Sequence, residues 1–131
     1  MDRAALEATA HALAVPGKGI LAADESPPTM GKRLSQIGMP NEERLRREFR
    51  ETLFTALGME EFISGVILFD ETLRQSASDG RDMAEILQSK GVIPGIKVDG
   101  GAHSMDSAPD EKLTAGLDGL AERCTEYYTL G

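Results

Sequence analysis

Three short apolar runs, each followed by acidic residues, constrain the fold of this chain more than any other feature. They cover residues 19–23, 65–69 and 93–98. The first two runs show no alternation with polar residues, and Lys97 is the one charged residue in the third. Such runs are typical of strands covered on both faces, as in parallel sheets. We therefore predict three parallel strands with Asp24, Asp70 and Asp99 at their carboxyl ends.

Helical patterns lie before, between and after these strands. We predict helices over residues 2–14, 41–57, 82–89 and 111–129. In the second helix we expect Asn41 to be the N-cap and Glu42 to pair with Arg46 one turn later. In the last helix we expect Leu113 and Leu117 to point inward. Strands that alternate with helices indicate an α/β fold with a parallel sheet.

The spacing of the acidic strand ends narrows the fold class further. Asp70 follows Asp24 by 46 residues, and Asp99 follows Asp70 by 29. A TIM (β/α)8 barrel repeats about every 30 residues, so the longer first interval leaves room for extra helical structure. The 131 residues allow one domain at most, and three strands cannot close a barrel. Two interpretations stay open: a partial TIM barrel of about three parallel strands with flanking helices, or a small doubly wound domain.

The charge balance limits the partners. The net charge of −8 argues against binding to nucleic acid or to an anionic membrane surface, since both need basic patches. No apolar run approaches the ~20 residues of a membrane span. A small phosphate compound stays possible, because a few local donors suffice to bind it.

Cysteine content and the amino-terminal residues bear on the compartment. Cys124 is the only cysteine, which excludes an intramolecular disulfide and suits a reducing compartment such as the cytoplasm. The first residues contain no apolar signal core. His11, His103 and Cys124 are scattered without ligand spacing, so we predict no metal site.

Two charged residues at strand ends are candidates for chemistry. In a barrel, Asp24 at the end of the first strand would point into the site that the βα loops form; alternatively it caps the next helix. Lys97 lies between Ile96 and Val98, whose side chains point the opposite way in a strand. Lys97 would then point inward in a barrel, where desolvation lowers the pKa of an amine and activates it. The alternative is a strand-end lysine that reaches solvent.

A hydroxyl and basic group follows the first strand. Ser26, Thr29, Lys32 and Arg33 lie within eight positions of each other. Hydroxyl groups and an arginine can together bind a phosphate near a helix N-terminus. An ordinary polar helix start has the same composition.

Several blocks of the sequence, in order, resemble the class I, Schiff-base-forming fructose-bisphosphate aldolases. The blocks are GKGILAADES at 17–26, KRL at 32–34, IG at 37–38, GVILF at 65–69, ETL at 71–73, KG at 90–91, GIKVD at 95–99, GLDGL at 116–120 and ERC at 122–124. The resemblance implies a TIM barrel that cleaves fructose 1,6-bisphosphate to dihydroxyacetone phosphate and glyceraldehyde 3-phosphate without a metal or other cofactor. It also implies a homo-oligomeric full-length form.

The resemblance assigns roles to individual residues. It implies that Asp24 assists imine formation and holds substrate hydroxyls, and that Lys97 keeps a neighbouring imine-forming lysine neutral. It implies phosphate contacts for Arg33, Ser26 and Thr29. Pro27-Pro28 departs from the small residues usual there, and removes two backbone N–H donors from that phosphate site.

The family's imine-forming lysine lies on a later strand that these 131 residues do not include. We therefore expect the chain to be the amino-terminal part of an aldolase barrel and to be inactive alone. A truncated sequence is the simplest explanation. The alternative is a non-catalytic interaction module derived from an aldolase.

Overall fold

The computed structural model describes residues 2–131, which form two compact units. The first unit ends at Ile96, and the second runs from Lys97 to Gly131. The first contains α1 (Arg3–Leu13), β1 (Gly19–Ala23), α2 (Pro27–Gln36), α3 (Glu43–Phe54), the 3-10 helix η1 (Met59–Glu61), β2 (Ile63–Leu68), α4 (Asp70–Leu73), α5 (Met83–Ser89) and β3 (Ile93–Ile96). The second contains β4 (Ala102–Met105), β5 (Ala108–Thr114) and α6 (Leu120–Thr129).

The first unit is built on a parallel three-stranded sheet in the order β1-β2-β3. Ala23 is paired with Leu68, and Leu68 with Ile96, so the three carboxyl ends meet at one edge. This confirms the predicted parallel strands. Two helices, α2 and α3, fill the long first interval, as its length predicted.

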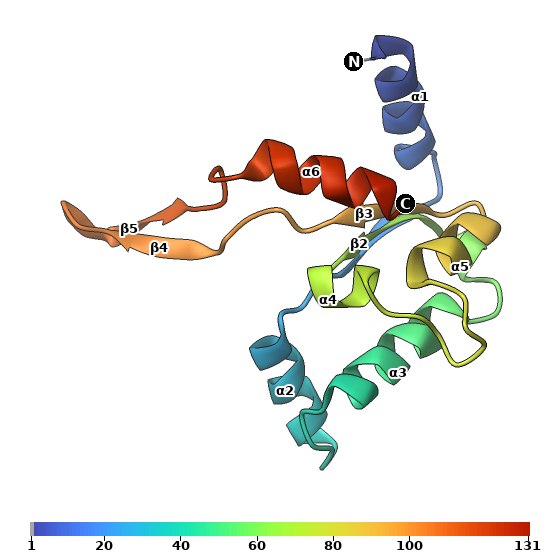
Figure 1. The fold of residues 1–131 in the computed structure, drawn as a ribbon, viewed down its shortest axis with the longest axis horizontal. Coiled ribbons are helices and arrows are strands. Elements are labelled where there is room, and N and C mark those ends of the chain that lie inside the picture. Colours follow the sequence, from blue (N-terminus) through green and yellow to red (C-terminus); the bar gives the residue numbers. More distant parts are fainter. Residues whose placement is uncertain (1) are drawn as a thin grey trace. The chain divides into compact units, whose positions relative to one another are not determined.

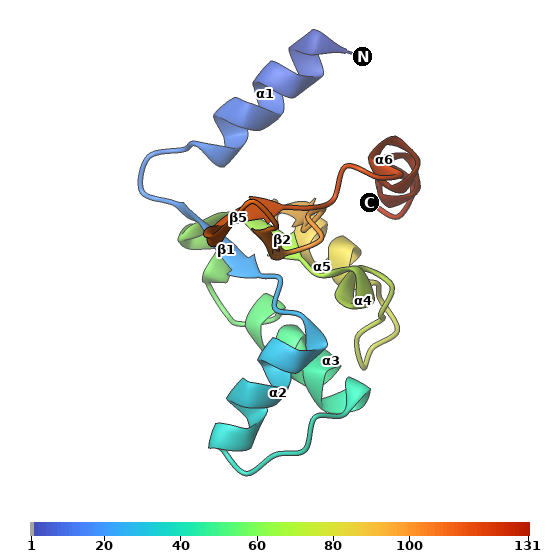
Figure 2. The same ribbon diagram turned by 90° about the vertical axis from the view of Figure 1, so that its left-hand side faces the viewer.

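The two faces of this sheet are covered unequally. α1 lies on one side of the sheet and α2 to α5 on the other (Figures 1 and 2). Val66 and Leu68 of β2 are buried, whereas Ile20 of β1 is 52% exposed. A cavity of about 220 Å³ lies on the α1 side, where Leu13 faces Ile20 of β1, Ile67 of β2 and Ile93 of β3. The expectation of strands covered on both faces is therefore wrong for β1 within this unit, since only the end of α1 reaches that face.

The start of α3 differs from the prediction. The helix begins at Glu43, and Asn41 is not its N-cap. The Asn41 side chain instead donates to the Pro27 carbonyl at 3.1 Å and accepts from Arg46 at 2.9 Å. Arg46 pairs with Glu71, not with Glu42 as predicted, because a partner from another element lies within reach.

The second unit is an antiparallel β4-β5 hairpin followed by α6. The predicted helix over 111–129 is wrong in its first half. Leu113 lies in β5 and is 63% exposed, and Leu117 is 83% exposed. Gly116 and Gly119 explain the difference, because both have positive φ and so interrupt a helix until α6 begins.

Among residues 2–131, no helix is both long and apolar enough to cross a bilayer.

Candidate functional site

The turn after β1 and the following helix α2 carry four of the five site residues that were predicted from the sequence. Asp24 follows the last strand residue, and Ser26 precedes the first turn of α2. Ser26 Oγ and Thr29 Oγ1 lie 3.2 Å apart, and the Ser26 side chain makes no capping hydrogen bond. Pro27 and Pro28 occupy the first two helical positions, so the backbone offers no N–H donors there. The hydroxyl pair therefore supplies hydrogen-bonding groups at this helix start.

Arg33, one turn further along α2, turns back toward the strand end. Its Nη2 lies 3.1 Å from Oε1 of Glu25, and its side chain is 59% exposed. Within residues 2–131 this is the ion pair the guanidinium makes, and it engages Nη2 alone. A guanidinium placed in this way can bind a planar or tetrahedral anion with its remaining donors.

Arg50 of α3 is part of the same site, although it was not predicted from the sequence. Its side chain is 1% exposed. Its Nε donates to the Ala23 carbonyl at 3.2 Å, and Nη2 donates to the Glu25 carbonyl at 2.8 Å and to Glu25 Oε2 at 3.2 Å. Burial lowers the pKa of the Arg50 guanidinium, and the negative charges of Glu25 and Glu71 oppose that change. Arginine remains charged even so.

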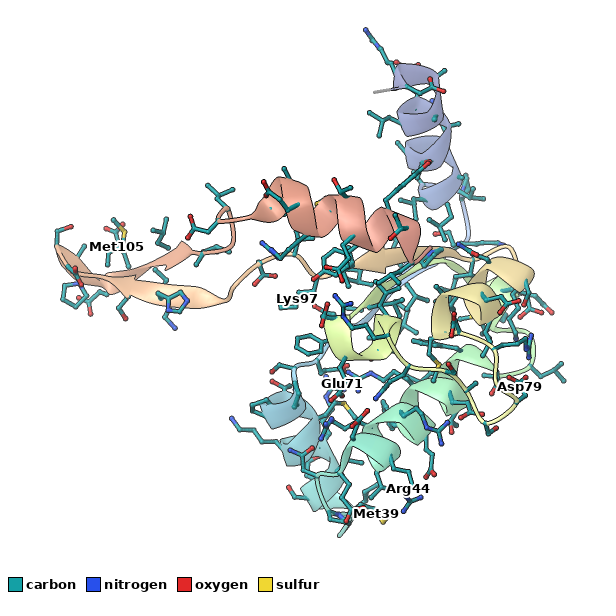
Figure 3. The ribbon with its side chains drawn as sticks, in the orientation of Figure 1. Met39, Arg44, Glu71, Asp79, Lys97 and Met105 are labelled. Atoms are coloured by element: carbon teal, nitrogen blue, oxygen red, sulfur yellow. The ribbon has the colours of Figure 1, made fainter. Side chains whose placement is uncertain are left out.

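A second polar chain ties the end of β2 to the start of α2. Glu71, at the start of α4, points toward α3 (Figure 3) and binds Arg46 through two hydrogen bonds of 2.8 and 2.6 Å. The hydrogen bonds that Arg46 donates to Glu71 raise the pKa of its guanidinium. Arg46 also donates to Asn41, which in turn holds the Pro27 carbonyl. Glu71, Arg46 and Asn41 therefore connect the start of α4 to the first turn of α2.

Lys97 lies in the second unit and not in the strand where it was predicted. β3 ends at Ile96, so Lys97 is the first residue after the strand, and its side chain is 28% exposed. It forms an ion pair with Asp99, which also accepts from the Gly101 N–H at 2.9 Å (Figure 3 marks Lys97). Together the Lys97 ammonium and this N–H hold the pKa of the Asp99 carboxyl below its usual range. The pairing of β3 with β2 ends at Ile96, opposite Leu68, so the apolar run overestimated the length of the strand.

In residues 2–131 the structure brings together no group of three or more His, Cys, Asp and Glu side chains that could hold a metal ion.

Comparison with known proteins adds to this geometry. The family described as "Fructose-bisphosphate aldolase class-I" matches residues 5–131. A probable fructose-bisphosphate aldolase class 1 of Xanthomonas axonopodis pv. citri is 52% identical over 126 residues, which cover 96% of this chain and 38% of the relative. The cytosolic fructose-bisphosphate aldolase 6 of Arabidopsis thaliana is also 52% identical over 126 residues, covering 96% of this chain and 35% of the relative.

A solved structure has the same fold. It is a fructose-bisphosphate aldolase from Plasmodium falciparum in complex with TRAP and a small molecule inhibitor. The TM-score is 0.93 at 49% sequence identity, over 96% of this chain and 36% of that chain. The present chain thus spans little more than a third of the length of these proteins, and its three-stranded sheet corresponds to part of a TIM barrel.

Proposed function

Because the chain belongs to the class I fructose-bisphosphate aldolase family, we propose that it supplies the first part of an aldolase active site. The complete enzyme would reversibly cleave fructose 1,6-bisphosphate to dihydroxyacetone phosphate and glyceraldehyde 3-phosphate, without a metal. Residues 1–131 would be the amino-terminal part of a single barrel domain. The complete form would be a cytoplasmic homo-oligomer, and the cytosolic Arabidopsis relative supports that location.

The observation that carries the proposal is the arrangement after β1. Ser26 and Thr29 present two hydroxyl groups 3.2 Å apart at the start of α2, and the side chain of Arg33 on that helix is 59% exposed. Hydroxyl groups and a guanidinium are the donors that bind a sugar phosphate. We therefore assign phosphate binding to Arg33, Ser26 and Thr29.

Asp24 and Lys97 have catalytic roles in this proposal. The Asp24 carboxylate accepts hydrogen bonds from substrate hydroxyls and moves protons during imine formation. Lys97 supplies a positive charge that favours the neutral form of an imine-forming amine, since like charges disfavour protonation. The imine then accepts the electron pair released when the carbon–carbon bond breaks.

The imine-forming lysine itself belongs to a later strand of the family's barrel, so we propose that these 131 residues alone are inactive. Incubation with dihydroxyacetone phosphate and borohydride tests this, because borohydride reduces an imine to a stable secondary amine. We expect mass spectrometry to find no such adduct on any lysine of the chain. An adduct at Lys97 or elsewhere would contradict the proposal.

A chimera tests the catalytic assignment directly. The 126 residues that are 52% identical to the Xanthomonas relative would replace the matching part of that protein. We expect the chimera to cleave fructose 1,6-bisphosphate, and Asp24→Asn to lower its kcat by a factor on the order of 10²–10⁴, as for loss of an acid–base group. The control is Asp79→Asn, which removes an exposed carboxylate paired with Arg81. Equal activity of the two variants would exclude Asp24 from the chemistry.

A further inference from the structure

The buried guanidinium of Arg50 is placed between two residues to which the proposed function assigns separate tasks. We propose that Arg50 is a positioning residue, which holds the backbone around Asp24 directly and the Arg33 guanidinium through Glu25. The inference rests on the proposed function for the roles of Asp24 and Arg33. The contacts themselves come from the hydrogen bonds of α3 with the end of β1.

The contact with the backbone brackets Asp24. Arg50 Nε binds the Ala23 carbonyl at 3.2 Å, and Nη2 binds the Glu25 carbonyl at 2.8 Å. These two carbonyls belong to the peptide planes before Asp24 and after Glu25. A planar, rigid guanidinium that binds both planes restricts the backbone angles of the two residues between them. The direction in which the Asp24 side chain leaves the backbone is therefore set by α3.

The contact with Arg33 passes through the two oxygens of one carboxylate. Glu25 Oε2 lies 3.2 Å from Arg50 Nη2, and Glu25 Oε1 lies 3.1 Å from Arg33 Nη2. The Glu25 side chain is 11% exposed, whereas that of Arg33 is 59% exposed. An exposed arginine would otherwise sample many rotamers and lose that freedom on binding a ligand. Glu25, fixed by Arg50, reduces the number of rotamers before a phosphate arrives.

The charges support this assignment. Glu25 alone would neutralise Arg33 and weaken its attraction for phosphate. With Arg50 present, two guanidinium groups share one carboxylate, so the group of three keeps a net positive charge. Because Arg50 is buried, the exposed Arg33 is the member that can use this charge to bind an anion.

The test uses the 131-residue chain and inorganic phosphate as the probe. Arg50→Lys keeps the charge but cannot bind three acceptors with a rigid fork. We expect the 15N order parameters of the Asp24 and Glu25 amides to fall from about 0.85, the value of a rigid backbone, toward about 0.6. We also expect phosphate, followed by the Arg33 Nε–Hε resonance, to bind at least about three-fold more weakly. The control is Arg44→Lys, the same change at an exposed position of α3 that pairs with Glu48, which should change neither quantity.

A second variant separates the effect of Arg50 on the backbone around Asp24 from its effect on Arg33 through Glu25. Glu25→Asp keeps the charge but shortens the side chain, so it should weaken phosphate binding while the order parameter at Asp24 stays high. If Arg50→Lys does not fold, a Glu25→Asp variant with wild-type phosphate affinity overturns the inference. Wild-type order parameters and affinity in a folded Arg50→Lys variant overturn it as well.

The proposed function is tested separately. Phosphate that binds an Arg33→Ala variant as tightly as the wild type would refute the phosphate role of Arg33. The order parameters around Asp24 would still decide whether Arg50 positions the strand end.

Discussion

The turn after β1 and the segment after β3 both carry candidate catalytic residues, but they are held in different ways. Around Asp24, the hydrogen bonds come from Arg50, which lies 25 to 27 residues away in the chain. Around Lys97, the ion pair with Asp99 and the hydrogen bond from Gly101 to Asp99 each span two residues. Arg123 of α6 also donates to the Val98 carbonyl at 3.0 Å, and the Gly100 N–H binds the Ala115 carbonyl at 2.7 Å. The first segment therefore depends on the docking of α3, whereas the second combines contacts within residues 97–101 with contacts to residues 115 and 123 of its own unit.

Removal of the Arg50 side chain should produce the largest loss in the free energy of unfolding, because it removes the long-range hydrogen bonds to residues 23 and 25. Arg50→Met leaves the Glu25 carboxylate and the Ala23 carbonyl without a buried partner, and we expect a loss of about 3–5 kcal/mol in the free energy of unfolding. Arg44→Met on the same helix is the matched control. Arg44 pairs with Glu48 at exposed positions four residues apart, which is worth about 0.3–0.5 kcal/mol. Urea denaturation followed by circular dichroism measures both.

Equal losses for the two arginine variants would show that α3 is held by its apolar side chains and that Arg50 adds little. The turn after β1 would then not depend on the long-range hydrogen bonds of Arg50.

The strands were predictable from the sequence because burial of a parallel strand leaves a continuous apolar run. The limits of each run were less certain: the third was expected to include Lys97, but the strand ends at Ile96. Hydrophobicity shows which residues can be buried, and not where the last ladder hydrogen bond forms. Gly91, just past α5, has φ of 71°, as expected for a glycine that ends a helix.

The site was predictable only where its residues are near in sequence. Thr29 and Arg33 lie on the short helix α2 and Ser26 directly precedes it, so their spacing indicated a shared location. Arg50 was missed because α3 is rich in arginine and its charges suggest a solvated face. One signal was available: Arg50 precedes the fully buried Phe54 by four residues, which places both on the inward side of the helix.

The hairpin was missed because its strands expose most of their side chains. β5 contains one apolar residue of the predicted helical stripe, Leu113, and its strand conformation comes from pairing with β4. Such pairing has no hydrophobic period, so the leucine spacing wrongly indicated a helix.

A glycine substitution should sharpen the local side of the comparison. A Cβ on Gly116 would lie 2.8 Å from the Gly100 nitrogen and 2.9 Å from the Asp99 Cα, at a φ of 129°. We expect Gly116→Ala to combine backbone strain of about 1–2 kcal/mol with overpacking of about 1–3 kcal/mol. Gly101→Ala is the control, because its φ is also positive but nothing lies within 4 Å of the added Cβ.

Hydrogen exchange at the Gly100 and Ala115 amides measures how well the two ends of the β4-β5 hairpin stay paired. Their N–H groups bind Ala115 and Gly101 carbonyls at 2.7 and 2.9 Å, where the hairpin begins and ends. Gly116→Ala should lose more protection there than Gly101→Ala. Equal losses would mean that close packing contributes nothing beyond the φ angle.

The smallest expected effect is the pH dependence of the segment after β3. The pKa of Asp99 is lowered in the folded chain by Lys97 and the Gly101 N–H. A lowered pKa stabilises the fold above the unfolded value of about 4, and this contribution is lost as the pH falls through the folded value. Asp99→Asn should therefore destabilise the segment at pH 7 and converge with the wild type at low pH. Asp110→Asn, an exposed change of equal charge in β5, controls for net charge. If the difference in protection at Gly101 between Asp99→Asn and wild type stays the same from pH 7 to pH 3, the ionised carboxylate does not hold Lys97, and the local character of this segment must come from its backbone alone.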